Sequence, residues 1–432
     1  MSMVATPPPM PHAPRARWWN AVRVGFFLAD RQVRANKGTT LLVITVMILT
    51  FLNLLVVSGA LVGIVQGLRA ERQTHYSGDL ILTNFNQKDS IQNASDVTSY
   101  LRTVPSIAAF SPRYVANAAL EGNYATKGQL SDKPDSIVTV AVGIDPVAEE
   151  ATTHFSQLLV EGEYLQRDDY DQILVGTSLL ERYKTGVSIP GTTPLPTVGV
   201  GSKVRLLVNG IEHEMTIKGI IASKLQEVDL RVFVVDRQLR SLLGRTDGAV
   251  NEIAIKLAPK VSAADVKAQL LQAGIGADAK VQLPLESEPV FFEDFAATFD
   301  KLGAFLGSIG LVIAFIAIFI LVFINTITRR RSIGILQAIG IQSSAIEIGY
   351  ILQSVLYASV GAAVGMLVLF LVLEPYFSHH PIDFPFSNGI LSVSFLEALT
   401  KASVLLVAIT LASFIPARLI MRQEIVDAIL GR

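Results

Sequence analysis

Residues 41–65 read LLVITVMILTFLNLLVVSGALVGIV, and the whole stretch from Gly38 to Leu68 contains no Asp, Glu, Lys or Arg. A transmembrane helix needs about 20 consecutive apolar residues to cross the hydrocarbon core of a bilayer. A secretory signal peptide has a shorter apolar region and would not normally follow such a long basic tail. We therefore predict a first transmembrane helix at 39–66 that stays in the mature protein.

Three further stretches have the length and composition of transmembrane helices. The first lies between Lys301 and Arg329 and is again free of charged residues, and the second begins near Glu347. The third starts less cleanly, because Glu397 and Lys401 precede its main apolar run. The predicted spans are 301–328, 344–373 and 394–418.

Basic residues near the ends of the spans predict the orientation, because cytoplasmic loops carry the excess of Lys and Arg. They cluster in the tail before the first span, in the turn after the second, and in the C-terminal segment. The connection between the third and fourth spans contains none. We predict a multi-pass inner-membrane protein with a cytoplasmic tail and amphipathic helix at 1–38, an outer loop at 374–393, and a cytoplasmic C-terminal tail at 419–432.

The segment between the first two spans, 67–300, has the pattern of a folded domain outside the membrane. Short apolar or alternating runs recur between turn signals, which is typical of strands. Asn209 and Gly210 tolerate the positive φ angles of a tight hairpin turn, and a helix is predicted at 263–273 with Ser262 as its N-cap and Gly274 at its end. The candidate strands are DLILT (79–83), SIVTVAVGI (136–144), QILVG (172–176), RVFVV (231–235) and NEIAIKL (251–257).

The predicted fold class is therefore an α-helical membrane protein with four transmembrane helices. A large α+β extracytoplasmic, or periplasmic, domain is inserted between helices 1 and 2. The composition agrees with this class, since 50% of the 432 residues are hydrophobic and only 17% are charged, whereas soluble domains carry about 25% charged residues. The net charge of -1 gives no basic excess that would indicate nucleic acid as a partner.

Motifs for catalysis and for nucleotide or metal binding are incomplete. The stretch nearest to a phosphate-binding loop is GVGSK at 199–203, where Ser202 separates the glycine from the lysine. His213 and Glu214 begin HEMTI, which lacks the second histidine of a metalloprotease helix. Cysteine is absent, which excludes thiolate catalysis and cysteine-ligated metals. We predict no catalytic, cofactor or metal site, and an anchored ectoenzyme is disfavoured.

Small and polar residues within two spans indicate helix contacts. Gly59 and Gly63 form a G-x-x-x-G arrangement that allows close approach, and Asn53 can hydrogen-bond to another helix. We interpret these three residues as a candidate dimer face of the first span. Glu397 and Lys401 are four residues apart, and we interpret them as a structural ion pair near the outer end of the fourth span.

The turn between the second and third spans reads TRRRSIGILQAIGIQSSAIEIGY, residues 328–350. Its three arginines are expected at the membrane face, and Ile333, Leu336 and Gly340 fall at helical spacing. The pattern predicts a short helix, within 329–343, that lies across the membrane surface. Its apolar face needs a partner or lipid.

This turn resembles that of the MacB, LolC/LolE and FtsX family of ABC transporter permeases, whose second span ends in an R-R-R-E-I-G-I-L-[KR]-A-[LI]-G-like stretch. Ser332 and Gln337 replace the acidic and the later basic residue of that pattern. The segments WWNAVRVGFFLADRQVRANKGTTLLVI and IPARLIMRQEIVDAILGR are similar to the two ends of the family's chains, and VTVAVGIDP is closer to the LolC/LolE branch. The resemblance implies ATPase-coupling residues Arg329, Arg330, Arg331, Ile333, Gly334, Leu336, Ala338 and Gly340.

The resemblance also implies a role. The chain would be a permease subunit without its own nucleotide site, and two copies of a separate ABC ATPase would bind ATP and Mg. A second permease subunit, identical or related, and membrane lipid would be further partners. The LolC/LolE branch implies lipoprotein release from the membrane, the MacB branch implies export of peptides, toxins or drugs from the periplasm, and the FtsX branch implies regulation of cell-wall hydrolases.

Overall fold

The computed structural model describes the chain except residues 1–13, 36, 125–134, 184–192, 197, 329, 385–386 and 422–432. Arg329 and most of the predicted C-terminal tail therefore lie outside the described residues. The chain divides into two compact units. The first comprises residues 1–63, 296–381 and 390–432, and the second comprises residues 64–295 and 382–389. The helices α2 and α8 contribute residues to both units.

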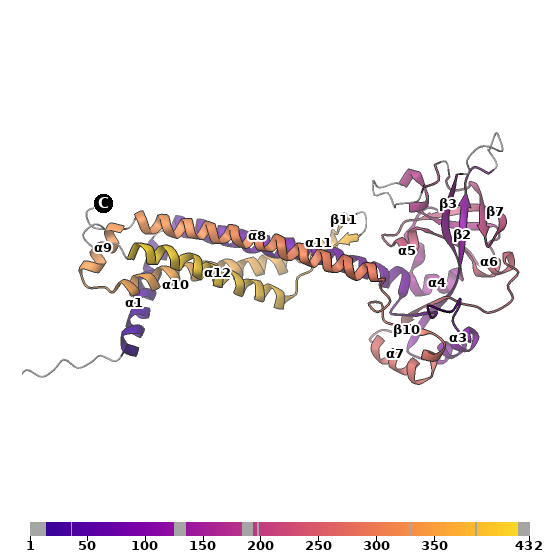
Figure 1. Cartoon of the computed structure of the whole chain (residues 1–432), viewed down its shortest axis with the longest axis horizontal. Helices are drawn as coiled ribbons and strands as arrows, with labels where there is room; N and C mark the ends of the chain where they lie inside the picture. Colours follow the sequence, from indigo (N-terminus) through magenta and orange to yellow (C-terminus); the bar gives the residue numbers. More distant parts are fainter. Residues whose placement is uncertain are drawn as a thin grey trace, which may run out of the picture. The chain divides into compact units, whose positions relative to one another are not determined.

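The first unit is a bundle of long helices (Figure 1). Four helical segments are long and apolar enough to cross a membrane, as the four charge-poor stretches predicted: Lys37–Ser77, Phe292–Ile324, Ser343–His379 and Phe395–Arg418. The helices are α1 (Pro14–Ala35), α2 (Lys37–Arg72), α8 (Val290–Thr328), α9 (Arg330–Ala338), α10 (Ser343–Val368), α11 (Glu374–His379) and α12 (Phe395–Met421), with a π-helical turn at Leu369–Leu373.

Small residues allow the apolar helices of the bundle to approach one another closely. A Cβ atom on Gly361 of α10 would stand 2.5 Å from Cβ of Met47, and one on Gly365 would stand 2.7 Å from Cδ1 of Phe51. Met47 and Phe51 of α2 are fully buried as a result. This is the packing expected of membrane helices, where lipid competes equally for apolar side chains and close van der Waals contact drives association.

The second unit is an α+β domain with one mixed sheet of ten strands, in the order β10-β1-β9-β2-β3-β8-β5-β7-β4, with β6 paired to β2 and β7. The pairs β3–β8 and β5–β7 are parallel, and the other pairs are antiparallel. Its strands are β1 (Leu80–Thr83), β2 (Ile107–Glu121), β3 (Ser136–Ile144), β4 (Leu159–Gly162), β5 (Gln172–Gly176), β6 (Lys203–Val208), β7 (Ile211–Ile221), β8 (Arg231–Val235), β9 (Glu252–Leu257) and β10 (Lys280–Gln282).

Five helices and a small hairpin complete this unit. The helices are α3 (Ala94–Thr103), α4 (Pro146–Thr153), α5 (Gln226–Asp229), α6 (Asp236–Leu242) and α7 (Ala263–Gln272). The hairpin of β11 (Ile382–Phe384) and β12 (Ser387–Gly389) lies in the predicted outer loop. The Oγ atom of Ser387 donates a hydrogen bond of 2.6 Å to the carbonyl oxygen of Ile64.

Two local predictions in this domain are confirmed by backbone geometry. Asn209 and Gly210 have φ angles of 49° and 82° and join β6 to β7 in a two-residue turn, as their tolerance of positive φ predicts. The Ser262 side chain accepts a hydrogen bond from the backbone N–H of Asp265 at the start of α7, and Gly274 follows the helix with φ 89°.

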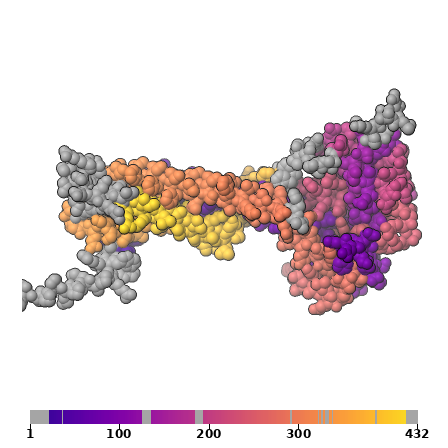
Figure 2. All heavy atoms as spheres, viewed as in Figure 1, coloured from indigo at the N-terminus to yellow at the C-terminus, as the bar shows by residue number. Residues whose placement is uncertain are grey.

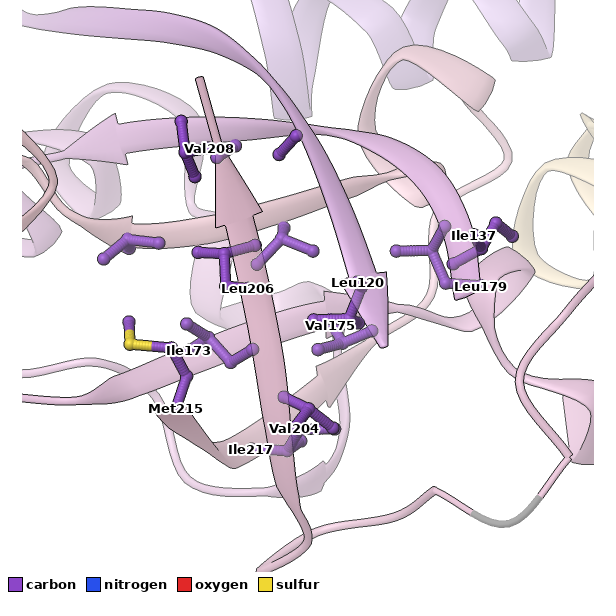
Figure 3. Packing of buried hydrophobic residues seen from close by; sticks show 14 of the residues in the cluster. Leu120, Ile137, Ile173, Val175, Leu179, Val204, Leu206, Val208, Met215 and Ile217 are labelled. Carbon is purple, nitrogen blue, oxygen red and sulfur yellow. The ribbon is translucent and has the colours of Figure 1, made fainter. Parts of the chain in front are cut away.

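The domain contains two hydrophobic cores that share β2. Figure 3 shows the larger core, where side chains from β2, β3, β5, β6 and β7 meet, among them Leu120, Ile137 and Ile173. The smaller core lies between β1, β9 and β10 and the helices α3 and α7. Because β2 pairs with β9 along its first part and with β3 and β6 along its second, one strand connects the two cores.

Candidate functional site

The turn between α8 and α10 folds as the short helix that the sequence predicts. The helix α9 ends in a Gly-based cap: Gly340 has φ 94°, and the backbone N–H of Ile341 donates a 3.1 Å hydrogen bond to the carbonyl oxygen of Leu336. This is the six-to-one bond of a Schellman motif, which needs a residue in the left-handed region. Nothing lies within 4 Å of the Cβ position of Gly340, so its glycine serves the backbone angle rather than close packing.

The side of α9 predicted to contact an ATPase instead faces the chain's own core. Ile333 is only 5% exposed, and with the half-buried Leu336 it packs against Ile346 and Tyr350 of α10 in a small cluster. The two residues also line a cavity of about 170 Å³ beneath the helix. The expectation that Ile333 and Leu336 present an outward apolar face is therefore corrected, because α10 and its neighbours already cover them.

The opposite side of α9 is apolar as well, and it is uncovered in this chain. Ile335 is 50% exposed and Ile339 is 71% exposed. Sequence reasoning missed these two residues, although their spacing of four places them on one side of a helix. Gly334 is buried and Ala338 is exposed, whereas Arg329 and the side chains of Arg330 and Arg331 lie outside the described residues.

The amphipathic helix α1 packs on α10 beside α9. A Cβ atom on Gly349 would stand 3.3 Å from the carbonyl oxygen of Gly25, and one on Gly25 would stand 2.9 Å from Cγ2 of Ile348. The contact therefore depends on two facing glycines. Phe26 and Phe27 remain exposed, which suits a helix lying in the membrane interface with aromatic side chains toward lipid.

The glycines of the predicted dimer face are covered by the chain itself. A Cβ atom on Gly63 would stand 1.6 Å from the carbonyl oxygen of Ile390, and one on Gly59 would stand 2.3 Å from Cγ2 of Val393. The backbone N–H of Ser392 also donates to the carbonyl oxygen of Gly59 at 3.3 Å. The G-x-x-x-G arrangement thus seats the segment after β12, and the interpretation of Gly59 and Gly63 as a dimer face is wrong.

Asn53, the third residue of that predicted face, also faces a helix of its own chain. Its Oδ1 atom lies 3.0 Å from the position that a Cβ on Gly310 of α8 would take. The predicted ion pair of the fourth span forms, with Lys401 Nζ 2.6 Å from Glu397 Oε1. Lys401 also donates to the Oγ atom of Ser58, so the pair joins α12 to α2.

In the second unit, charged groups surround the end of α2. The Arg72 guanidinium donates to Glu227 Oε2 at 3.0 Å, to Ser287 Oγ at 2.7 Å, and to two backbone carbonyls. The Tyr76 ring that follows is approached by three guanidinium groups, those of Arg72, Arg113 and Arg231, at 5.1 to 5.5 Å from its centroid. These cation–π contacts and hydrogen bonds fix the end of α2 in the domain.

The carboxylates of this cluster balance its arginines. Arg113 and Glu149 are joined at 2.5 Å and are both almost completely buried. Glu252 lies 3.4 Å from Arg231 and 3.6 Å from Arg113. Burial alone would raise the pKa of the Glu252 carboxyl, but the charges of Arg231 and Arg113 outweigh burial and hold that pKa below its usual value. The cluster is therefore charged and paired, which is typical of a structural anchor.

Among the described residues, no group of three or more His, Asp or Glu could hold a metal ion. The adjacent His379 and His380 each make a hydrogen bond through Nδ1 to a carbonyl oxygen of their own helix, those of Pro375 and Tyr376. In the part of the chain that the structure describes, the candidate functional features are therefore the exposed apolar side of α9 and the charged cluster at the end of α2. The absence of a cofactor stays a prediction.

Two family models agree with this architecture. The family model of the MacB-like periplasmic core domain matches residues 40–273, and that of the FtsX-like permease C-terminal matches residues 304–425. The crystal structure of the periplasmic region of MacB from Actinobacillus actinomycetemcomitans is similar at 15% identity and a TM-score of 0.34, covering 50% of this chain and 94% of that one. The comparison with curated proteins found no match.

The two domain matches together span most of the described bundle and domain. The chain belongs to the MacB/FtsX/LolC-type family of ABC transporter permeases. Permease subunits of this family lack an ATPase site of their own, and they work with an ABC ATPase in an oligomeric assembly in a membrane.

Proposed function

We propose that this chain is the permease subunit that carries ATPase-driven motion to a periplasmic domain for the release of lipoproteins from the inner membrane. The observation that supports the proposal most strongly is α9, a capped helix between two membrane spans that exposes Ile335 and Ile339. An exposed apolar pair beside three arginines suits a protein partner at the membrane surface. The partner is the cognate ATPase, which would be present in two copies and bind ATP and Mg.

The route of transmission follows from the helices that leave the bundle. The helix α2 is continuous from Lys37 to Arg72, and Arg72 is held by Glu227 and Ser287. The helix α8 is continuous from Val290 to Thr328, and α9 begins at Arg330. A rigid-body displacement of α9 would therefore reach residue 290 through one unbroken helix, and helix stiffness would carry it.

Two alternative cargoes belong to the same mechanism. MacB-like export of peptides, toxins or drugs would use the same helices, and FtsX-like regulation would act on a cell-wall hydrolase without moving cargo. Lipoprotein release is preferred because residues 138–146 resemble the LolC/LolE branch. Reconstitution of the purified complex into proteoliposomes carrying a labelled lipoprotein tests the preference: ATP-dependent release supports it, and ATP turnover without release contradicts it.

The contact with the ATPase is tested on α9 itself. We expect Ile339→Asp to abolish copurification of the ATPase, because it places a charge in an apolar contact. The matched control is Gln342→Asp, which adds the same charge three residues later at the N-cap of α10, where Asp is well tolerated. Retention of the ATPase by Ile339→Asp at normal membrane levels would contradict the contact.

The orientation is part of the proposal, with both termini in the cytoplasm and the domain outside. The chain contains no cysteine, so any labelling by a thiol reagent arises from the one cysteine that a variant introduces. An impermeant thiol reagent applied to wall-permeabilised cells should label Gln272→Cys in α7 and spare Ser343→Cys at the start of α10. Labelling of position 343 alone would show the opposite orientation, with the domain in the cytoplasm.

A further inference from the structure

A cavity of about 390 Å³ lies between three membrane helices, α2, α8 and α12. Its walls are mostly apolar or small, and they include Leu54 and Val62 of α2, Gly303 and Gly307 of α8, and Val404 of α12. The absence of side chains at the two glycines keeps this space open. Figure 2 shows α8 in orange and α12 in yellow side by side on the face toward the viewer.

Three charged groups lie around this apolar space. Lys401 of α12 donates to Glu397 and to Ser58, and an ammonium has three N–H groups, so one remains for another acceptor. Asp300 of α8 is exposed and makes no hydrogen bond or ion pair with any residue in the described part of the chain. The positive charge of Lys401 balances the negative charge of Glu397. The negative charge of Asp300 is not balanced by an ion pair within the described residues.

This arrangement restricts the chemistry of an occupant. The Asp300 carboxylate lies just before the predicted span 301–328 and has no partner among the described residues, so a positively charged group complements it. The remaining N–H of Lys401 selects an anionic oxygen. The apolar walls select hydrocarbon. A purely anionic lipid would face two carboxylates, whereas a lipid with an ammonium and a phosphate in one headgroup complements both signs.

We propose that the cavity binds a phospholipid with an ethanolamine headgroup. The primary ammonium of the lipid donates to the Asp300 carboxylate, its phosphate accepts from Lys401, and part of one acyl chain lies on the walls next to Gly303 and Gly307. A choline headgroup carries the same charges but has no N–H to donate, so it binds less tightly. The site does not depend on the cargo of the permease.

The test is lipid retention by the full-length chain. The purified protein is equilibrated with mixed vesicles of equal parts phosphatidylethanolamine, phosphatidylcholine and phosphatidylglycerol, and bound lipids are counted by native mass spectrometry. We expect the wild type to retain phosphatidylethanolamine preferentially. Asp300→Asn should lower the ratio of bound ethanolamine to choline lipid about tenfold, the effect of losing one charge-assisted hydrogen bond.

Two further variants keep the proposal falsifiable. Glu293→Gln removes an exposed carboxylate from α8 outside the cavity and should leave the lipid ratio unchanged. Gly303→Leu should displace both lipids, because Gly303 lines the cavity and the nearest atom to its Cβ position is 3.7 Å away.

Four outcomes would overturn the proposal. The first is an unchanged ratio of bound ethanolamine to choline lipid in Asp300→Asn, and the second is an equal fall of that ratio in Glu293→Gln, which would mark the lipid as non-specific. The third is preferential retention of phosphatidylglycerol by the wild type. The fourth is a wild-type dimer without bound lipid that Gly303→Leu converts to monomers. The last outcome would assign the cavity to a second copy of the chain.

Discussion

The two units bury ion pairs in different ways. In the α+β domain, Arg113 and Glu149 are 2% and 0% exposed, and Glu149 also accepts hydrogen bonds from Ser111 and Thr153. In the bundle, Lys401 and Glu397 are 21% and 33% exposed and lie at an open cavity. A fully desolvated pair is tolerated only when its remaining polar atoms are satisfied. The domain meets that condition for the Glu149 carboxylate, while Nη1 of Arg113 has no hydrogen bond and lies 3.6 Å from Oε2 of Glu252. The bundle instead leaves its pair accessible.

The largest expected effect comes from breaking the buried pair of the domain. Arg113→Met leaves Glu149 buried without its cation, and the expected loss of stability is about 3–5 kcal/mol. Hydrogen exchange of the full-length chain should show protection of the amides in β2 and β3 falling by more than about 100-fold. The control is Arg182→Gln, which removes an exposed pair with Glu161, and it should leave the protection of both strands unchanged. Equal protection in Arg113→Met and the wild type would show that the pair is not needed.

An intermediate effect is expected from the glycines of α2 in the bundle. Gly63→Ala places a methyl group against the carbonyl of Ile390, and overpacking of this kind costs about 1–3 kcal/mol. The melting temperature of the purified chain in detergent should fall. Gly38→Ala is the control, because nothing lies within 4 Å of its Cβ position. If Gly63→Ala instead dissociated an oligomer and left the melting temperature unchanged, the dimer interpretation would be restored.

The smallest effect is a pH dependence in the domain. The pKa of Glu252 lies below its usual value in the folded state, so its charge stabilises the fold above the unfolded pKa of about 4.3. That contribution is lost as the pH falls through the folded pKa. Hydrogen exchange of β9, corrected for the intrinsic rate, should therefore lose protection below about pH 4.3, and Glu252→Gln should flatten this dependence. An identical slope in the variant would assign the acid sensitivity to other carboxylates.

Much of the fold follows from local sequence signals. Strands β3, β5 and β8 have the predicted bounds, because each is a short apolar run between turn residues. The longest strand, β2, was not predicted. Its sequence IAAFSPRYVANAALE contains Pro112 and a mixture of polar and small residues. It forms because three strands, β9, β3 and β6, hydrogen-bond to it along its length. Tertiary context of this kind overrides strand propensity.

The contact surfaces were less predictable than the elements. Gly59 and Gly63 correctly indicate close approach, but a small-residue pattern cannot say whether a helix or a loop makes that approach. The helix α9 has isoleucines on two sides, at Ile333 and at Ile335 with Ile339, so periodicity alone could not decide which side faces the chain. The packing of α1 and α10 against α9 decides it, and the facing glycines of those helices, Gly25 and Gly349, have no recognisable motif.

The strand β1 has a consequence for biosynthesis. Among the described strands it pairs with β9 and β10 alone, and β10 ends at Gln282, about 200 residues later in the chain. At a synthesis rate of about 5–20 residues per second, ~10–40 s pass between the synthesis of β1 and the synthesis of β10. During this time the backbone N–H and C=O groups of β1 lack their partner strands. Contacts between such distant residues form slowly. The nascent domain is therefore open to aggregation during that interval, so a chaperone that holds β1 before residue 282 is synthesised would raise the yield of folded protein.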